Sequence, residues 1–160
     1  MAIIEKEDYI FDVHIEKTKE YYATRTLCDC NKCQNYYRQA EERFPKTKNF
    51  LSDFGIDIAR PDEIHSTYNK GDVDYHAVTY TAVGECIKFG KYEFDMEDGG
   101  LFINLVINKT PVFPNEQGNR QCFEIFIYNI RLPWVLETPH EEEIPKISFW
   151  TKIKRLFKNG

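Results

Sequence analysis

The sequence predicts an α+β domain in which an N-terminal strand and two short helices pack on an antiparallel β-meander of about four strands. Three observations predict this class. Apolar residues recur at helical spacing between positions 33 and 54, Val, Ile, Tyr and Phe fill much of 73–132, and a hairpin signal lies at 97–100. The chain has 160 residues, of which 42% are hydrophobic, enough for one domain with a buried core. We expect this domain to span residues 1–137.

The first half begins with a strand and continues into helices. Residues 9–15 (YIFDVHI) alternate apolar and polar side chains, as a half-buried strand does. The next segment, 16–26, allows one or two helical turns followed by a loop. A helix is expected from Asn31, and Pro45 ends it or opens the second helix, which stops at Gly55. The apolar positions of the first helix are Cys33, Tyr36, Tyr37, Ala40 and Phe44.

The second half is predicted to be β-structure. It follows an extended segment at 56–64 and a turn at 69–71, and its strands are expected at 73–89, 92–96, 101–109 and 120–132. Gly84 indicates a bulge or bend in the first of these strands, and Gly90-Lys91 a turn back into the second. The last strand is apolar on both faces, which favours a central position.

Beyond the domain, composition changes twice. Residues 138–145 are predicted to be an acidic linker and residues 146–160 a basic amphipathic tail. In a helix, the aromatic and aliphatic side chains of the tail would largely face away from its lysines. Such a tail docks on the sheet, stays partly disordered, or makes peripheral contact with an anionic membrane.

Charge and cysteine content argue against some functional classes, namely nucleic-acid-binding and disulfide-bonded proteins. The net charge is −5, but five of the 21 basic residues and none of the 26 acidic ones fall in 146–160, so residues 1–145 carry −10. An acidic body argues against nucleic-acid binding, and it suits a basic protein partner or serves solubility alone. No signal peptide or membrane span is recognisable, so a cytoplasmic location is expected. The five cysteines then favour reduced thiols or a metal over disulfides.

Cys28, Cys30 and Cys33 form a C-x-C-x-x-C pattern. Zinc binds four ligands, often thiolates, so the pattern predicts three ligands of a zinc site, with His14 as the first candidate for the fourth. His65 and Cys86 are further candidates. Two other interpretations stay open: a redox pair at a helix start, or ordinary packing and loop cysteines.

Acidic and tyrosine residues cluster in the β half. Asp72 and Asp74 share one strand face, as do Glu93 and Asp95. Such a face is a solvated sheet surface, an electronegative surface for a basic partner, or the carboxylate set of a divalent-metal-dependent enzyme. The predicted partner-binding residues are Asp72, Asp74, Tyr75, Tyr80, Tyr92, Glu93, Asp95 and Tyr128. We predict no catalytic residue, because no nucleophile elbow, zincin or phosphate-loop motif occurs.

The runs CDCNKCQNYY, FLSDFGIDIARPDEI and LPWVLE resemble a family of small bacterial cytosolic proteins without an assigned activity, over most of residues 9–137. In size and build such proteins are similar to the immunity proteins of bacterial toxin systems, acidic α+β modules that block a toxin by binding it. The resemblance implies a non-enzymatic inhibitor of the immunity or antitoxin type. A small structural zinc protein and a divalent-metal enzyme are the alternatives.

Overall fold

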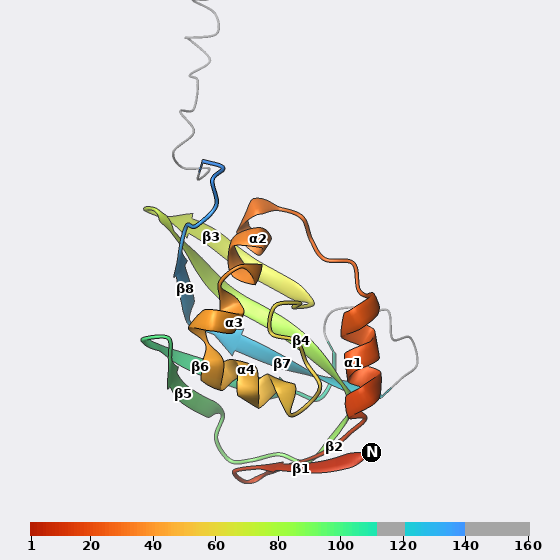
Figure 1. Ribbon diagram of the computed structural model, residues 1–160. Coiled ribbons are helices and arrows are strands. Elements are labelled where there is room, and N and C mark those ends of the chain that lie inside the picture. Colours follow the sequence, from red (N-terminus) through yellow and green to blue (C-terminus); the bar gives the residue numbers. More distant parts are fainter. Residues whose placement is uncertain (112–120, 140–160) are drawn as a thin grey trace, which may run out of the picture.

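Helices and strands form two layers in the computed structural model, which describes residues 1–111 and 121–139. Four helices occur in these residues: α1 (Ile15–Thr24), α2 (Asn31–Tyr37), α3 (Ala40–Arg43) and α4 (Pro45–Ser52). The strands are β1 (Ala2–Lys6), β2 (Tyr9–Val13), β3 (Glu63–Asn69), β4 (Asp72–Lys88), β5 (Phe94–Asp98), β6 (Leu101–Asn108), β7 (Cys122–Tyr128) and β8 (Ile130–Pro133). The helices lie on one face of an antiparallel sheet (Figure 1), and the α+β class is confirmed. The expected tail at 146–160, and the linker from residue 140 onward, lie outside the described residues.

Strand β4 is the long strand with which four others pair: β2, β3, β7 and β8. The strand order is β1-β2-β4-β7-β6-β5, with β3 and β8 paired to the first half of β4 on its two sides. On β7, Ile125 pairs with Tyr80 of β4 and with Ile107 of β6, so the expected central strand is confirmed. Asn129, with φ +67°, divides the expected strand 120–132 into β7 and β8.

The sheet is not a simple meander, because β4 and β5 are not neighbours. The chain leaves β4 at Lys88 and crosses the end of the sheet to its far edge (Figure 1), where the sequence indicated a turn back at Gly90-Lys91. The backbone N–H of Lys91 donates to a carboxylate oxygen of Asp8 at 2.8 Å, in the turn between β1 and β2. This bond ties the connection to that end of the sheet. From β5 onward the strands do pair in succession, through the expected hairpin.

Helix α1 and strands β1 and β3 are present in addition to the elements that the sequence predicted. α1 fills the segment that allowed only one or two turns, because Thr18, Tyr21 and Tyr22 are buried along one of its sides. β1 pairs with β2, and β3 pairs with β4 through the expected turn, where Lys70 and Gly71 both have positive φ.

Helices α2 to α4 follow one another with short breaks. The helix expected from Asn31 is interrupted after Tyr37, and α3 adds a single turn before Phe44. Pro45 opens α4, as Pro at a first helical position does, and Gly55 with φ +82° ends the turn after it, as expected.

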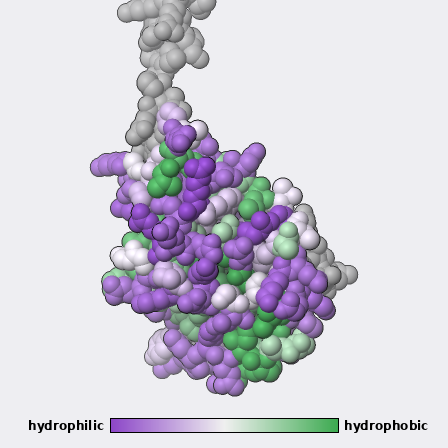
Figure 2. Space-filling view, viewed as in Figure 1, coloured by the Kyte–Doolittle hydropathy of each residue, from purple (hydrophilic) through white to green (hydrophobic). Residues whose placement is uncertain are grey.

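The core between the two layers is built largely from aromatic rings. Phe11 of β2 lies 5.0 Å from Phe54 and 5.2 Å from Phe123 of β7, measured between ring centroids. The surface on the helix side is mostly hydrophilic, with hydrophobic atoms gathered near β1 and β2 (Figure 2). Within residues 1–111 and 121–139 no helix has the length and apolar content needed to cross a bilayer.

Candidate functional site

Cys28, Cys30 and Cys33 come together in the loop after α1 and the first turn of α2. Their three sulfur atoms all lie within 4.8 Å of one another. Cys28 and Cys30 are exposed, whereas Cys33 is buried. Across the described part of the chain, no other three His, Cys, Asp or Glu side chains gather in this way. The C-x-C-x-x-C spacing thus brings its thiols together, as a shared metal ion requires.

Contacts on both sides of the cysteine loop fix its course. Before the loop, Arg25 forms an ion pair with the buried carboxylate of Asp62, to which the Tyr21 hydroxyl also donates. Within the first turn of α2, the carbonyl oxygen of Lys32 accepts a hydrogen bond from the Tyr75 hydroxyl at 2.7 Å. The thiols are therefore carried by a segment that is tied to the sheet at each end.

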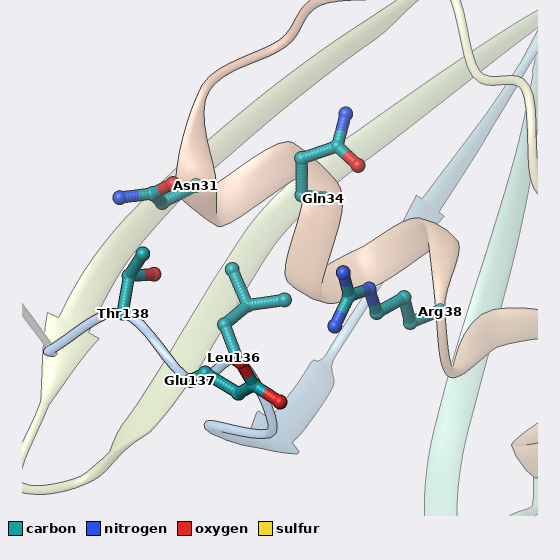
Figure 3. A pocket seen from close by; sticks show the side chains of 6 residues that line it. All are labelled: Asn31, Gln34, Arg38, Leu136, Glu137 and Thr138. Carbon is teal, nitrogen blue, oxygen red and sulfur yellow. The ribbon is translucent and has the colours of Figure 1, made fainter.

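The outer side of α2 forms a pocket of about 280 Å³ with the segment that follows β8. Figure 3 shows that side chains of the two segments face one another across it. The lining residues are Asn31 and Gln34 from α2, Arg38 directly after it, and Leu136, Glu137 and Thr138 from the other side.

Burial and mutual hydrogen bonding make the three thiols unequal in acidity. Burial raises the pKa of Cys33 far above its usual value, and hydrogen bonds with Cys30 and Cys28 raise it further. Burial also opposes ionisation of Cys30, but the backbone N–H of Cys33 and the two neighbouring thiols stabilise its thiolate, so its pKa is lowered. Cys30 therefore loses its proton before Cys33.

His14 does not join the cysteines. It directly precedes α1, where its N–H donates to the carbonyl oxygen of Val83 at 2.8 Å. Cys28 follows the opposite end of this ten-residue helix, whose length is about 15 Å. His65 and Cys86, on β3 and β4, also lie outside the cluster. The prediction of His14 as the fourth ligand is therefore not supported.

Two predicted partner-binding tyrosines are buried, and this corrects the prediction for them. Tyr75 is 1% exposed and Tyr80 is fully buried, both beneath the helices. The hydroxyl of Tyr80 donates to the carbonyl oxygen of Ile58 at 2.6 Å and also bonds the hydroxyl of Tyr36. Because both side chains are committed to the core, neither can anchor a partner.

Asp72 and Asp74 lie on the opposite face of β4 and share a cation. The Arg131 Nε atom of β8 lies 2.8 Å from a carboxylate oxygen of Asp74 and 3.7 Å from one of Asp72. Asp74 and Arg131 also line a second pocket, of about 340 Å³. Arg131 offsets one of the two negative charges that the sequence suggested for a partner or a divalent ion.

The open face of β5, β6 and β7 holds the remaining acidic and aromatic residues. Cross-strand pairing places Glu97 opposite Phe102, Asp95 opposite Asn104, and Asn104 opposite Tyr128. The Phe126 and Tyr128 rings stack with their centroids 6.1 Å apart. We call this set the acidic–aromatic patch; its members are Asp95, Glu97, Phe102, Asn104, Phe126 and Tyr128.

Two further predicted residues lie directly before β5. Burial and the negative charge of Glu93 both raise the pKa of Tyr128. Tyr92 is 68% exposed and lies in the connection before β5, where the Lys91 ammonium is 5.0 Å from its ring centroid.

Phe102 and Phe126 were not among the partner-binding residues predicted from the sequence. Phe102 is 77% exposed, the highest value among the large hydrophobic residues described. The signal was present, because Phe102 shares the strand parity of Asn104 and Asn108. An aromatic residue on the polar side of an alternating strand could have been recognised as surface-exposed.

Searches for similar protein families, curated proteins and solved structures found no match for this chain.

Proposed function

We propose that the chain is a non-enzymatic protein-binding module that recognises a basic protein through the acidic–aromatic patch. The observation that carries the proposal is Phe102, 77% exposed on the sheet face that the helices leave uncovered, beside the turn between β5 and β6. A side chain of this size gains most when it is buried against another molecule.

The surroundings of Phe102 favour a basic partner. Asp95 and Glu97 are exposed on the neighbouring strand, and in the described residues neither carboxylate has an ion-pair partner. The excess of ten negative charges over residues 1–145 would attract a basic surface over longer distances. Aromatic anchors rimmed by charges of one sign combine affinity with selection for the opposite charge.

The narrower form of the proposal is an immunity or antitoxin-type inhibitor that acts in the cytoplasm. A small acidic module of this build would inhibit a basic toxin by covering the toxin's positive surface. Inhibition of this kind needs no catalytic group in the inhibitor. The toxin-like partner would supply lysine and arginine side chains to Asp95 and Glu97, and a shallow apolar site to Phe102.

The test is affinity capture from the native host, followed by binding measurements with the purified partner. We expect a stoichiometric basic protein whose dissociation constant rises roughly 30-fold or more for Phe102→Ala, as for an interface hot spot. Asp95→Asn and Glu97→Gln should slow association and flatten its dependence on salt. If the partner is a toxin, co-expression of the wild-type chain should restore growth and Phe102→Ala should not.

Matched controls come from the other side of the molecule. Val135→Ala shortens another exposed hydrophobic side chain, and Glu20→Gln removes an exposed charge from α1; neither should alter binding. A partner that binds Phe102→Ala with unchanged affinity would exclude the patch as the interface. Failure to capture any stoichiometric protein from the native host would count against the binding module itself.

A further inference from the structure

The cysteine cluster has a geometry close to that of a metal-binding thiolate set. Zinc–sulfur bonds of about 2.3 Å at tetrahedral angles place neighbouring sulfur atoms about 3.8 Å apart. The three sulfur atoms here are within 4.8 Å of one another, so each pair needs to close by about 1 Å at most. Rotation of the exposed Cys28 and Cys30 side chains is enough for that, while Cys33 stays in place.

The cluster is also accessible and well supported. Cys28 and Cys30 are exposed, so an ion can reach the sulfur atoms without unfolding of the helix layer. Cys33 lies on α2, which is fixed to the sheet because Asn35 donates to the carbonyl oxygen of Pro133 at 3.1 Å. Cys33 is thus a fixed ligand, and Cys28 and Cys30 can adjust their side chains to an ion. Binding would therefore require only a small loss of conformational entropy.

We propose that Cys28, Cys30 and Cys33 bind one thiophilic d¹⁰ metal ion, with zinc(II) as the expected occupant, through three thiolate sulfur atoms. Because zinc takes four ligands, the fourth position is left to a water molecule or to a donor from a bound partner. The site thus differs from a closed structural zinc site, and His14 has no part in it.

The surroundings suit a complex of this charge. Three thiolates and one zinc ion carry a net charge of −1. Lys32 belongs to the same turn of α2 and brings one positive charge to it, with its side-chain nitrogen 5.0 Å from the Tyr68 ring centroid. Tyr37, four residues after Cys33, lies on the same side of α2 as that ligand.

The experiment titrates cadmium(II), and zinc(II) in competition, into the full chain after reduction and removal of metal. We expect one equivalent to produce the ultraviolet sulfur-to-cadmium charge-transfer band, with an intensity that corresponds to three thiolates. Cobalt(II) should give the intense visible bands of tetrahedral coordination. Cys28→Ser and Cys30→Ser should each leave two thiolates and weaken binding at least about 100-fold, because even outer-shell changes cost 10–100-fold.

Controls separate this site from the remaining cysteines. The double variant Cys86→Ser/Cys122→Ser should keep the full band and affinity, and His14→Asn should do the same. Circular dichroism of Cys30→Ser, where the side chain is exposed, checks that lost binding is not lost folding. The proposal is overturned if one equivalent of cadmium gives no charge-transfer band, or if Cys30→Ser keeps the full three-thiolate band and the wild-type affinity. A protein that instead isolates with a disulfide among these cysteines, and takes up no ion after reduction, overturns it as well.

Discussion

The hydroxyl oxygen atoms of Tyr36 and Tyr80 lie 2.7 Å apart at the centre of the interface between helices and sheet. Both side chains are fully buried. Tyr80 has a single hydroxyl proton and lies 2.6 Å from the carbonyl oxygen of Ile58, so it donates there and accepts from Tyr36. This chain of two hydrogen bonds joins α2, β4 and the segment after α4.

Removing the Tyr80 hydroxyl, which makes both hydrogen bonds, should lower the free energy of unfolding more than removing the Tyr36 hydroxyl, which makes one of them. Tyr80→Phe leaves the Tyr36 hydroxyl and the Ile58 carbonyl buried without their partner, and should lower the free energy of unfolding by about 2–4 kcal/mol. Tyr36→Phe leaves the Tyr80–Ile58 bond intact and should cost about 1 kcal/mol. Urea unfolding at neutral pH measures both values. Equal losses would show that the two bonds do not depend on one another as described.

Alkaline pH should destabilise the fold through the buried tyrosines. Burial raises the pKa of Tyr22, Tyr36 and Tyr80 well above the ordinary value of 10.0. The unfolded chain therefore loses these protons at lower pH than the folded chain, and stability that is complete below pH 10 declines above it. Each of these three groups contributes about 1.4 kcal/mol per pH unit to the slope of the free energy of unfolding, and the raised pKa of Tyr75 adds to it.

The measurement is urea unfolding across a pH series above 10, with tyrosinate absorbance recorded on the same samples. Tyrosinate from the three buried residues should appear only together with unfolding. Tyr80→Phe should reduce the slope by about 1.4 kcal/mol per pH unit, the contribution of one titrating group. A slope that is unchanged in Tyr80→Phe would contradict the assignment.

Asn35 should be the polar residue of α2 on which the fold depends most. Its amide nitrogen donates to the Pro133 carbonyl oxygen at 3.1 Å and to the Tyr75 hydroxyl at 3.2 Å, and its amide oxygen accepts from the Val135 N–H at 2.9 Å. Asn35→Ala removes all three bonds at once and should cost about 2–4 kcal/mol. Hydrogen exchange at the Val135 amide should accelerate.

The matched control is Arg38→Ala, at the exposed residue that directly follows α2. It removes a side chain without a buried bond and should change stability by less than about 0.5 kcal/mol. If Asn35→Ala were equally mild, the attachment of α2 to β8 would have to rest on packing alone.

Strand periodicity predicted which residues of β4 are in a strand, but not which of them face the helices. Tyr75 and Tyr80 are five residues apart, so regular alternation places them on opposite faces. Pairing with β3 shifts register here, since His65 pairs with Ala77 while Ser66 pairs with Tyr75. His76 is therefore an extra residue, and it brings both tyrosines to the covered face. No local sequence signal marks a bulge at this position.

The cysteine cluster could be predicted because its three residues span only six positions, and local backbone geometry decides whether their sulfur atoms meet. The fourth ligand could not be predicted in the same way. Its identity depended on the length and direction of α1, the segment for which the sequence allowed only one or two turns. Because α1 forms fully, it separates His14 from Cys28. The prediction of His14 failed because it depended on how the chain between the two residues folds.

The last prediction concerns Gly84, where the sequence indicated a bulge or bend. Gly84 has φ +140° and pairs with Val13 of β2, so closely that an added Cβ would overlap the Asp12 carbonyl oxygen and lie 2.9 Å from the Val13 Cα. Both obstacles are backbone atoms and cannot rotate away. Gly84→Ala should therefore force β2 away from β4 and cost about 3 kcal/mol or more.

Gly71→Ala separates backbone conformation from this close contact. Gly71 also has a positive φ, of +89°, but no atom lies within 4 Å of the Cβ that a substitution would add. Its cost should be limited to the strain of a left-handed backbone, about 1–2 kcal/mol. Urea unfolding of the two variants measures the difference, and hydrogen exchange should show loss of protection in β2 for Gly84→Ala alone. Similar costs would mean that β2 can withdraw from β4 freely, so that contact with Gly84 does not determine how the N-terminal hairpin joins the sheet.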